Sequence, residues 1–125
     1  MATDRFEKVT SLETGDRIRI QFVGDDPVET GGIEFPNPWE TTVVSVHEET
    51  KDPRQGDDVR HMEFHRTARV EPPDGVIAPD RVAFETAHRM DQDNKLSLVY
   101  RQLIEDSPGH YTLHPLGFEE IGVLD

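Results

Sequence analysis

Hydrophobic and polar residues alternate along much of this chain, which is the pattern of half-buried β-strands. The first clear example is 17–22, where two isoleucines and a phenylalanine alternate with polar residues. A β-branched run at 41–46 and an alternating run at 59–70 each predict a further strand. Arg66 falls on the apolar side of the second of these runs, which predicts a bulge or a strand end near it.

Residues 82–90 fit two kinds of secondary structure. Val82, Phe84 and Thr86 alternate as in a strand, whereas Asp80 could cap a helix with one apolar face. We favour the strand on the strength of the alternation.

The C-terminal part of the chain predicts three more strands. Residues 96–104 form the most apolar run, which is typical of a central strand of a sheet. A turn at 105–109 leads to 110–114 as the hairpin partner of that strand, and 121–124 predicts a short final strand.

Two internal segments interrupt the pattern. Glycine and proline are too dense in 24–38 for regular structure, so we expect a long loop there. The charged stretch 48–58 is expected to be a mobile loop, and residues 1–10 are expected to be mobile as well.

About seven short strands separated by turns predict a mostly β protein with little or no helix, folded as a small antiparallel barrel or sandwich. We expect residues 1–125 to form a single domain. The segment 12–20, with an apolar residue, two spacers, Gly-Asp and alternating apolar residues, resembles the first strand of SH3-like barrels. This resemblance implies an SH3-like barrel as one form of the fold and implies no function.

The charge of the chain adds an expectation about its solvent. There are 26 acidic and 13 basic residues, which give a net charge of −13, and only three of the basic residues are lysines. Such a charge destabilises a small domain by self-repulsion, which molar salt screens because the Debye length falls to about 3 Å at 1 M. The acidic, lysine-poor composition resembles that of cytosolic proteins from salt-in halophiles and implies adaptation to high salt.

Several classes of function find no support in the sequence. The absence of cysteine excludes disulfides, thiolate metal ligands and a cysteine nucleophile. No apolar stretch is long enough to cross a bilayer, and the N-terminal residues are polar, so we expect a cytoplasmic protein with no membrane partner. Phosphate-binding loops and the nucleophile elbow are absent, and no carboxylate pair stands out. We therefore assign no catalytic residue and favour a non-enzymatic protein.

The histidines provide the first candidate site. His61, Glu63 and His65 occupy alternate positions, so a strand would place all three on one face. Imidazole and carboxylate groups are ligands for zinc, manganese, iron or nickel, which makes a divalent metal the one cofactor that this pattern suggests. His110 and His114 would join the site if the two strands were neighbours. The alternative is that these are polar residues facing solvent.

A second candidate is a group of arginines in segments that contain few acidic residues: Arg60, Arg66, Arg69 and Arg101. Arginine beside an aromatic residue such as Tyr100 can bind phosphate and stack on a base, which would suit a nucleic acid. The net charge opposes nucleic acid at long range, and the alternative is that these arginines pair with neighbouring carboxylates.

The third candidate is the aromatic pair Phe35 and Trp39, which lies beside two prolines. A stiff segment of this kind can present aromatic surface to a protein partner. The alternative, which we favour because tryptophan is seldom fully exposed, is that both residues fold inward and fill one end of the barrel.

These patterns favour a non-enzymatic binding or adaptor domain with a protein partner that the sequence does not identify. A small metal-binding protein that uses His61, Glu63 and His65 is the first alternative. A nucleic-acid-associated barrel is the second alternative, disfavoured by the net charge.

Overall fold

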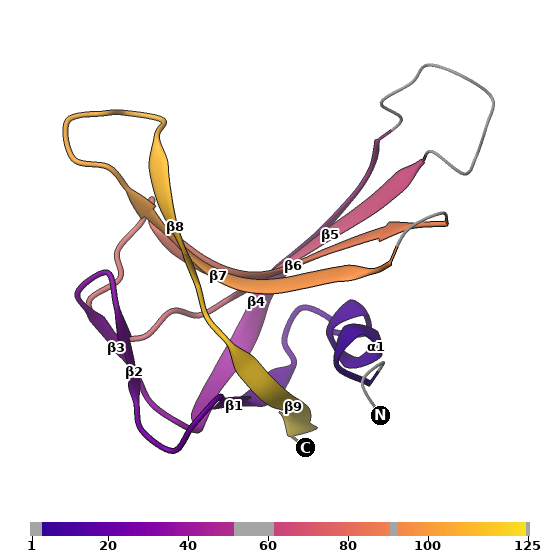
Figure 1. The fold of residues 1–125 in the computed structure, drawn as a ribbon, viewed down its shortest axis with the longest axis horizontal. Helices are drawn as coiled ribbons and strands as arrows, with labels where there is room; N and C mark the ends of the chain where they lie inside the picture. Colours follow the sequence, from indigo (N-terminus) through magenta and orange to yellow (C-terminus); the bar gives the residue numbers. More distant parts are fainter. Residues whose placement is uncertain (1–3, 52–61, 91–92, 125) are drawn as a thin grey trace.

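The computed structural model describes residues 4–51, 62–90 and 93–124 (Figure 1). In these residues one short helix, α1 (Asp4–Thr10), precedes nine strands. The strands are β1 (Arg17–Phe22), β2 (Val28–Thr30), β3 (Ile33–Phe35), β4 (Trp39–Lys51), β5 (Glu63–Val70), β6 (Arg81–Arg89), β7 (Lys95–Leu103), β8 (Tyr111–Pro115) and β9 (Phe118–Leu124). Seven strands form one antiparallel sheet in the order β8-β7-β6-β5-β4-β1-β9, and β2 pairs with β3. The prediction of a mostly β, antiparallel fold with little helix is confirmed.

The seven-stranded sheet curls into a half-barrel (Figure 1). Along β1, Ile18, Ile20 and Phe22 are buried on the inner face, whereas Arg17 and Arg19 are exposed on the outer face. The chain passes from β8 at one edge of the sheet to β9 at the other, so these two strands border the opening of the half-barrel. The inner face carries the core, and the outer face is the side of the sheet that points away from it.

Helix α1 and the β2–β3 hairpin fill the inside of the half-barrel from opposite ends (Figure 1). Val9 of α1 and Leu12, just after the helix, are buried in the core. Phe35 of β3 packs against the rings of Phe22, Trp39 and Tyr100. The prediction of one long loop at 24–38 is therefore wrong in its central part, because a tight turn at two glycines lets β2 and β3 pair there.

The predicted irregularity near Arg66 is also wrong. β5 pairs without interruption with β6, and the shift in register lies in β4, between Val43 and Ser45. Val43 and Val46 both pack toward the core although they are three residues apart, and Val44 between them is exposed. An extra residue at this bulge moves the inner-face positions of β4 from odd to even numbers.

Arg66 remains in register on the inner face because its guanidinium has partners there. Its Nη1 donates a 2.9 Å hydrogen bond to the Val9 carbonyl oxygen, and its Nη2 donates to the Leu12 carbonyl oxygen. Its Nε lies 3.4 Å from Oε1 of Glu48 on β4. Arg66 thus binds carbonyl groups at and just after the C-terminal end of α1, of which the Val9 carbonyl also accepts a 3.2 Å hydrogen bond from the Leu12 N–H.

The other strand predictions have mixed outcomes. Residues 82–90 form a strand and not a helix, and β7 and β8 form the predicted hairpin. β7 lies inside the sheet, as predicted, because it pairs with β6 on one side and with β8 on the other. Residues 48–51 belong to β4, whereas 52–58 lie outside the described residues, and the mobility predicted for 1–10 and 48–58 stays a prediction.

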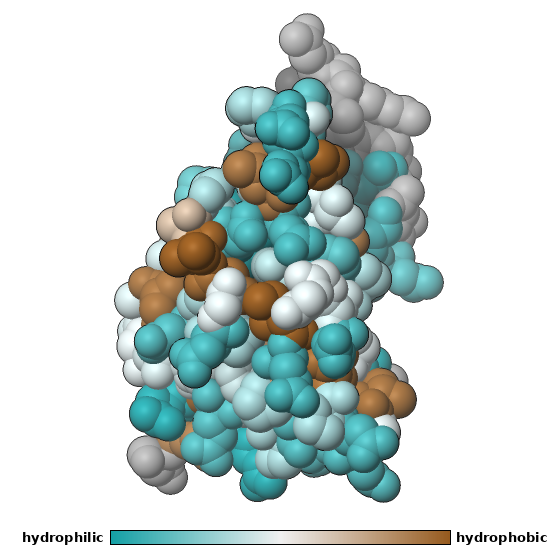
Figure 2. All heavy atoms as spheres, turned by 90° about the vertical axis from the view of Figure 1, so that its left-hand side faces the viewer, coloured by the Kyte–Doolittle hydropathy of each residue, from teal (hydrophilic) through white to brown (hydrophobic). Residues whose placement is uncertain are grey.

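The side of the molecule seen in Figure 2 is mostly hydrophilic. Figure 2 shows the side that carries β8 and the β2–β3 hairpin, where hydrophilic residues interrupt the hydrophobic ones. Within the described residues, no helix combines the length and the apolar character that a membrane span requires.

Candidate functional site

The outer face of β5, β6 and β7 brings three arginines together. Arg81 lies directly opposite Arg101 in the β6–β7 pairing, and Arg69 lies opposite Ala83, two residues from Arg81. Residues at these cross-strand positions are close neighbours on the same face of a sheet. We call Arg69, Arg81 and Arg101 the outer arginine cluster. The residue next to each of them in its strand points into the core, namely Val70, Val82 and Tyr100.

The outer arginine cluster lacks carboxylate partners. Among the residues that the structure describes, none of its three side chains forms an ion pair. Other arginines do, since Arg66 lies 3.4 Å from Glu48 and Arg17 lies 3.8 Å from Glu40. The alternative that the predicted arginines pair with neighbouring acids therefore holds for Arg66 and fails for Arg69 and Arg101, in a chain with 26 acidic residues.

The electrostatic environment of Arg81 reflects this concentration of positive charge. Partial burial lowers the pKa of Arg81, and the charges of Arg101 and Arg69 lower it further. Glu85, two positions beyond Ala83 on β6, acts in the opposite direction on the pKa but forms no ion pair with Arg81. The lowered pKa does not remove the charge of Arg81, because arginine is not deprotonated in proteins.

Tyr111 positions one member of the cluster. The Cζ atom of Arg101 lies 5.1 Å from the centre of the Tyr111 ring, in a cation–π contact. The Nε atom of Arg101 is buried and has no hydrogen-bond partner among the described residues. The side chain of Arg101 is thus held against the sheet by its neighbour on β8 and not by an acidic residue.

Two small apolar residues lie among the arginines on the outer face. Ala83 is 2% exposed and Val99 is 9% exposed, although neither belongs to the core cluster. They are direct cross-strand partners, and Arg69 and Pro115 are the next residues on either side of them. Neighbouring side chains must therefore cover Ala83 and Val99. The base of the outer arginine cluster is thus a small apolar surface that water does not reach.

Sequence reasoning identified this site only in part. Arg69 and Arg101 are brought together, Arg66 lies on the opposite face, and Arg60 lies outside the described residues. Arg81 was missed, because its place beside Arg101 depends on the pairing of β6 with β7. The aromatic partner was also wrong, since Tyr100 is buried in the core.

Tyr111, not Tyr100, is the aromatic neighbour of Arg101, and alternation could have indicated this. Consecutive residues of a strand point to opposite faces, so Tyr100 and Arg101 cannot act on the same ligand. Tyr111 lies opposite Leu103, two residues from Arg101 on the same face of the hairpin. The hairpin was predicted, and its register is what places this contact.

The predicted metal site is not assembled by the described residues. Glu63 and His65 share the outer face, with Oε1 and Nε2 3.4 Å apart, while His61 lies outside the described part of the chain. β5 and β8 are not neighbours, because β6 and β7 separate them, and His114 points inward to Thr30 and to a glutamine on β7. Within 4–51, 62–90 and 93–124, no group of three metal-ligating side chains is arranged to hold an ion.

The aromatic pair predicted to meet a partner is buried. Phe35 has no exposed surface and Trp39 is 4% exposed. Their ring centres lie 5.4 Å apart at an interplanar angle of 79°, and Trp39 also stacks on Phe22. These positions agree with the inward-folding alternative and leave no aromatic surface of this pair for a partner.

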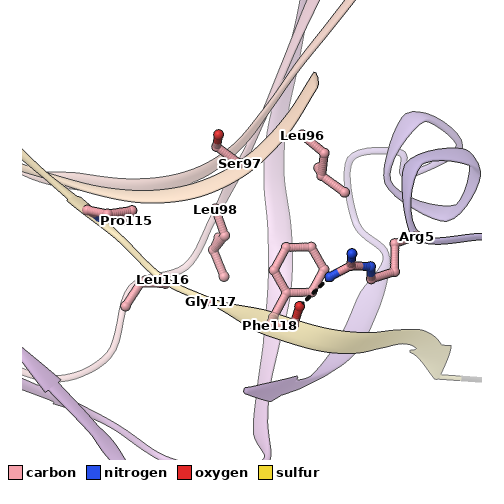
Figure 3. Close-up of a pocket in the computed structure, with 8 residues that line it drawn as sticks. All are labelled: Arg5, Leu96, Ser97, Leu98, Pro115, Leu116, Gly117 and Phe118. Carbon is pink, nitrogen blue, oxygen red and sulfur yellow. Dashed lines mark hydrogen bonds between the residues drawn. The ribbon is translucent and has the colours of Figure 1, made fainter. Parts of the chain in front are cut away.

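The opening of the half-barrel contains a pocket of about 250 Å³ (Figure 3). Leu96 and Leu98 on β7 line one side, Phe118 on β9 lines the other, and Arg5 reaches in from α1. Arg5 Nη1 donates a 2.6 Å hydrogen bond to the Phe118 carbonyl oxygen, and its Cζ lies 5.6 Å from the centre of the Phe118 ring. Arg5 thus joins α1 to β9, which is a structural role.

Comparison with protein-family models, curated proteins and solved structures found no match. The chemistry of the site is therefore the basis for a functional proposal. Guanidinium groups are permanent cations that donate several hydrogen bonds, so an array of them binds anions and does not supply a general base.

Proposed function

We propose that this protein is a non-enzymatic binding module that recognises an anionic partner with the outer arginine cluster. The observation that carries the proposal is that three neighbouring arginines form no ion pair among the described residues. Arg66 and Arg17 do form ion pairs there. Like charges directly opposite each other destabilise a sheet. A bound anion would offset this repulsion. Ligand binding would therefore stabilise the folded protein.

The setting of the cluster adds to the proposal. Its arginines project from three adjacent strands in the middle of a sheet, which is a more rigid support than a loop. The rest of the molecule is strongly acidic, with a net charge of −13. An anionic partner is therefore repelled by the protein as a whole and attracted at one place, which favours binding through a defined group of contacts.

The cellular setting belongs to the same proposal. The composition, which resembles that of cytosolic proteins from salt-in halophiles, supports a cytoplasmic protein that works at high salt. Exposed ion pairs are strongly screened under such conditions. The outer arginine cluster lies beside the buried pair Ala83 and Val99. Its attraction for an anion is therefore screened less than that of a fully exposed ion pair.

A capture experiment with paired variants tests the proposal. The protein, the R81Q/R101Q variant and the R17Q/R19Q variant would each be immobilised and exposed to a native lysate in molar KCl. Arg17 and Arg19 also lie on the outer face, on β1, so this control removes the same charge from a different place. We expect one partner to be retained by the protein and by R17Q/R19Q, and to be lost with R81Q/R101Q. Equal retention by both variants would contradict a role for the outer arginine cluster.

A further inference from the structure

We propose that the ligand group bound by the outer arginine cluster is a phosphate monoester in its dianionic form. This inference rests on the proposed function, because it names the chemistry that the same site recognises. The direct Arg81–Arg101 pair would bind the phosphate oxygens, and Arg69 would approach from the diagonal position on β5.

The number of charges points to a dianion. Three arginines lie on one region of the outer face, and the carboxylate that acts on Arg81 there, that of Glu85, forms no ion pair in the described chain. A single carboxylate is satisfied by one arginine, through two parallel hydrogen bonds. It would therefore leave the repulsion within the cluster largely in place, whereas a group with two negative charges offsets more of it.

The arrangement of donors points to a phosphate. The three arginines project from three adjacent strands on the same face of the sheet, so their N–H groups can reach a ligand from different directions. A phosphate monoester presents three strong acceptor oxygens in a tetrahedral arrangement, which suits donors from different directions. A phosphodiester carries one charge and fewer free oxygens, so a nucleic acid backbone fits this site less well.

Part of the site is organised before any ligand arrives. The Tyr111 ring holds Arg101 at 5.1 Å, and the Arg101 Nε is buried, so the Nη groups of this side chain are the ones left to meet a ligand. Holding the side chain in place reduces the conformational entropy lost on binding. The Ala83–Val99 pair beneath lowers the local dielectric and strengthens each contact with an anion.

Titration with small phosphate compounds tests the inference directly. The probes are methyl phosphate, dimethyl phosphate and acetate, each added at constant ionic strength in KCl while the Nε–H resonances of the arginines are followed by NMR. We expect methyl phosphate to shift the resonances of Arg81 and Arg101 in a saturable way. Dimethyl phosphate and acetate should bind about tenfold more weakly, the size expected for one lost charge-assisted contact.

Matched variants show whether binding occurs at the proposed place. R81Q/R101Q should weaken methyl phosphate binding by about 100-fold, since two such contacts are lost, while R17Q/R19Q leaves it unchanged. Removing two like charges relieves repulsion, so R81Q/R101Q is expected to fold, which its melting temperature checks. Titration of the unmodified protein gives an answer even if that variant does not fold.

The outcomes separate this inference from the proposed function. Absence of saturable shifts with methyl phosphate would overturn the inference, and if partner capture still depended on Arg81 and Arg101, the proposed function would stand. Equal affinity for dimethyl phosphate would also overturn it and would favour a nucleic acid backbone. Binding of methyl phosphate without any effect of R81Q/R101Q on capture would support the inference and contradict the proposed function.

Comparison of O-phosphoserine with adenosine 5′-monophosphate then identifies the source of the phosphate. Tighter binding of O-phosphoserine indicates a phosphorylated protein, and tighter binding of adenosine 5′-monophosphate indicates a nucleotide.

Discussion

Gly31 and Gly32 form the turn of the β2–β3 hairpin and differ in what surrounds them. Both have positive φ angles, 59° and 78°, as the turns of tight hairpins require. A Cβ atom on Gly31 would lie 2.8 Å from Cε2 of Tyr100, which is buried, whereas a Cβ atom on Gly32 would meet nothing within 4 Å. The carbonyl oxygen of Gly31 also accepts a 3.0 Å hydrogen bond from Nε2 of Gln102. Gly31 thus combines a turn conformation with a close approach to the sheet.

These two glycines allow backbone strain to be separated from steric conflict. We expect G32A to destabilise the protein by about 1 kcal/mol, the cost of a left-handed conformation for a residue with a Cβ atom. G31A should cost about 3 kcal/mol, because the new methyl group also displaces a buried ring. Denaturant unfolding in molar KCl measures both free energies of unfolding. Equal effects of the two substitutions would show that the hairpin does not pack against Tyr100 as closely as the structure has it.

The sequence pattern predicted which residues of β1 are buried but not the role of Arg66. Alternation placed Ile18, Ile20 and Phe22 in the core, because a strand with one buried face has a period of two residues. It did not place Arg66, a charged residue that follows the apolar register and bonds to the end of a helix far away in the sequence. A polar residue at an inner position has no local explanation until its distant partner is known.

Helix α1 shows how a short element depends on the rest of the fold. It has seven residues, too few for an isolated helix to be stable in water. Its stability comes from Val9, which is buried against the sheet, and from Arg66, which bonds to its C-terminal end. Nothing in the local pattern of residues 4–10 distinguishes such a helix from a polar tail, which is why the sequence did not predict it.

Substitution of Arg66 tests this dependence. R66M keeps the length of the apolar stem but removes the donors to the carbonyl groups of Val9 and Leu12. We expect a loss of about 2–3 kcal/mol in the free energy of unfolding, because two partly buried hydrogen bonds from a charged group are lost together with the contact to Glu48. Amide hydrogen exchange should also show faster opening of α1.

R69M is the matched control for that substitution. It removes the same group three residues further along β5, but from the outer face and from a cluster of like charges. We expect its free energy of unfolding to change by less than about 0.5 kcal/mol, as for surface substitutions away from a buried network. A similar loss for R66M and R69M would contradict the role of Arg66 at the end of α1.

At the scale of the whole molecule, the balance of charge dominates. The chain of 125 residues carries a net charge of −13. Repulsion between these charges opposes the compact state, and salt reduces it over distances greater than the Debye length. The outer arginine cluster is a local exception, in which the repulsion is between positive charges.

Stability should therefore depend strongly on salt. Between dilute buffer and about 2 M KCl we expect the melting temperature to rise by about 10 °C or more, which corresponds to about 2–3 kcal/mol for a domain of this size. Differential scanning calorimetry across a KCl series measures this rise. A melting temperature that does not change with KCl would contradict the high-salt interpretation.

A variant with fewer acids serves as the control for the salt series. Substituting Asp25→Asn, Asp26→Asn, Glu29→Gln and Glu34→Gln changes the net charge from −13 to −9, since each substitution removes one negative charge. All four residues are exposed, so the substitutions leave the core intact. The variant should show a smaller rise of the melting temperature with KCl than the unmodified protein.

The sequence alone determined most strands of the seven-stranded sheet, the buried face of strands such as β1, and the net charge of the chain, but not β2 and β3. These properties depend on local alternation and on composition, which a single sequence contains in full. The tertiary structure alone decided the order of the strands, the docking of α1 and the β2–β3 hairpin, and the meeting of Arg69, Arg81 and Arg101. Those features depend on which strands pair and in what register, and pairing is settled by contacts between residues far apart along the chain.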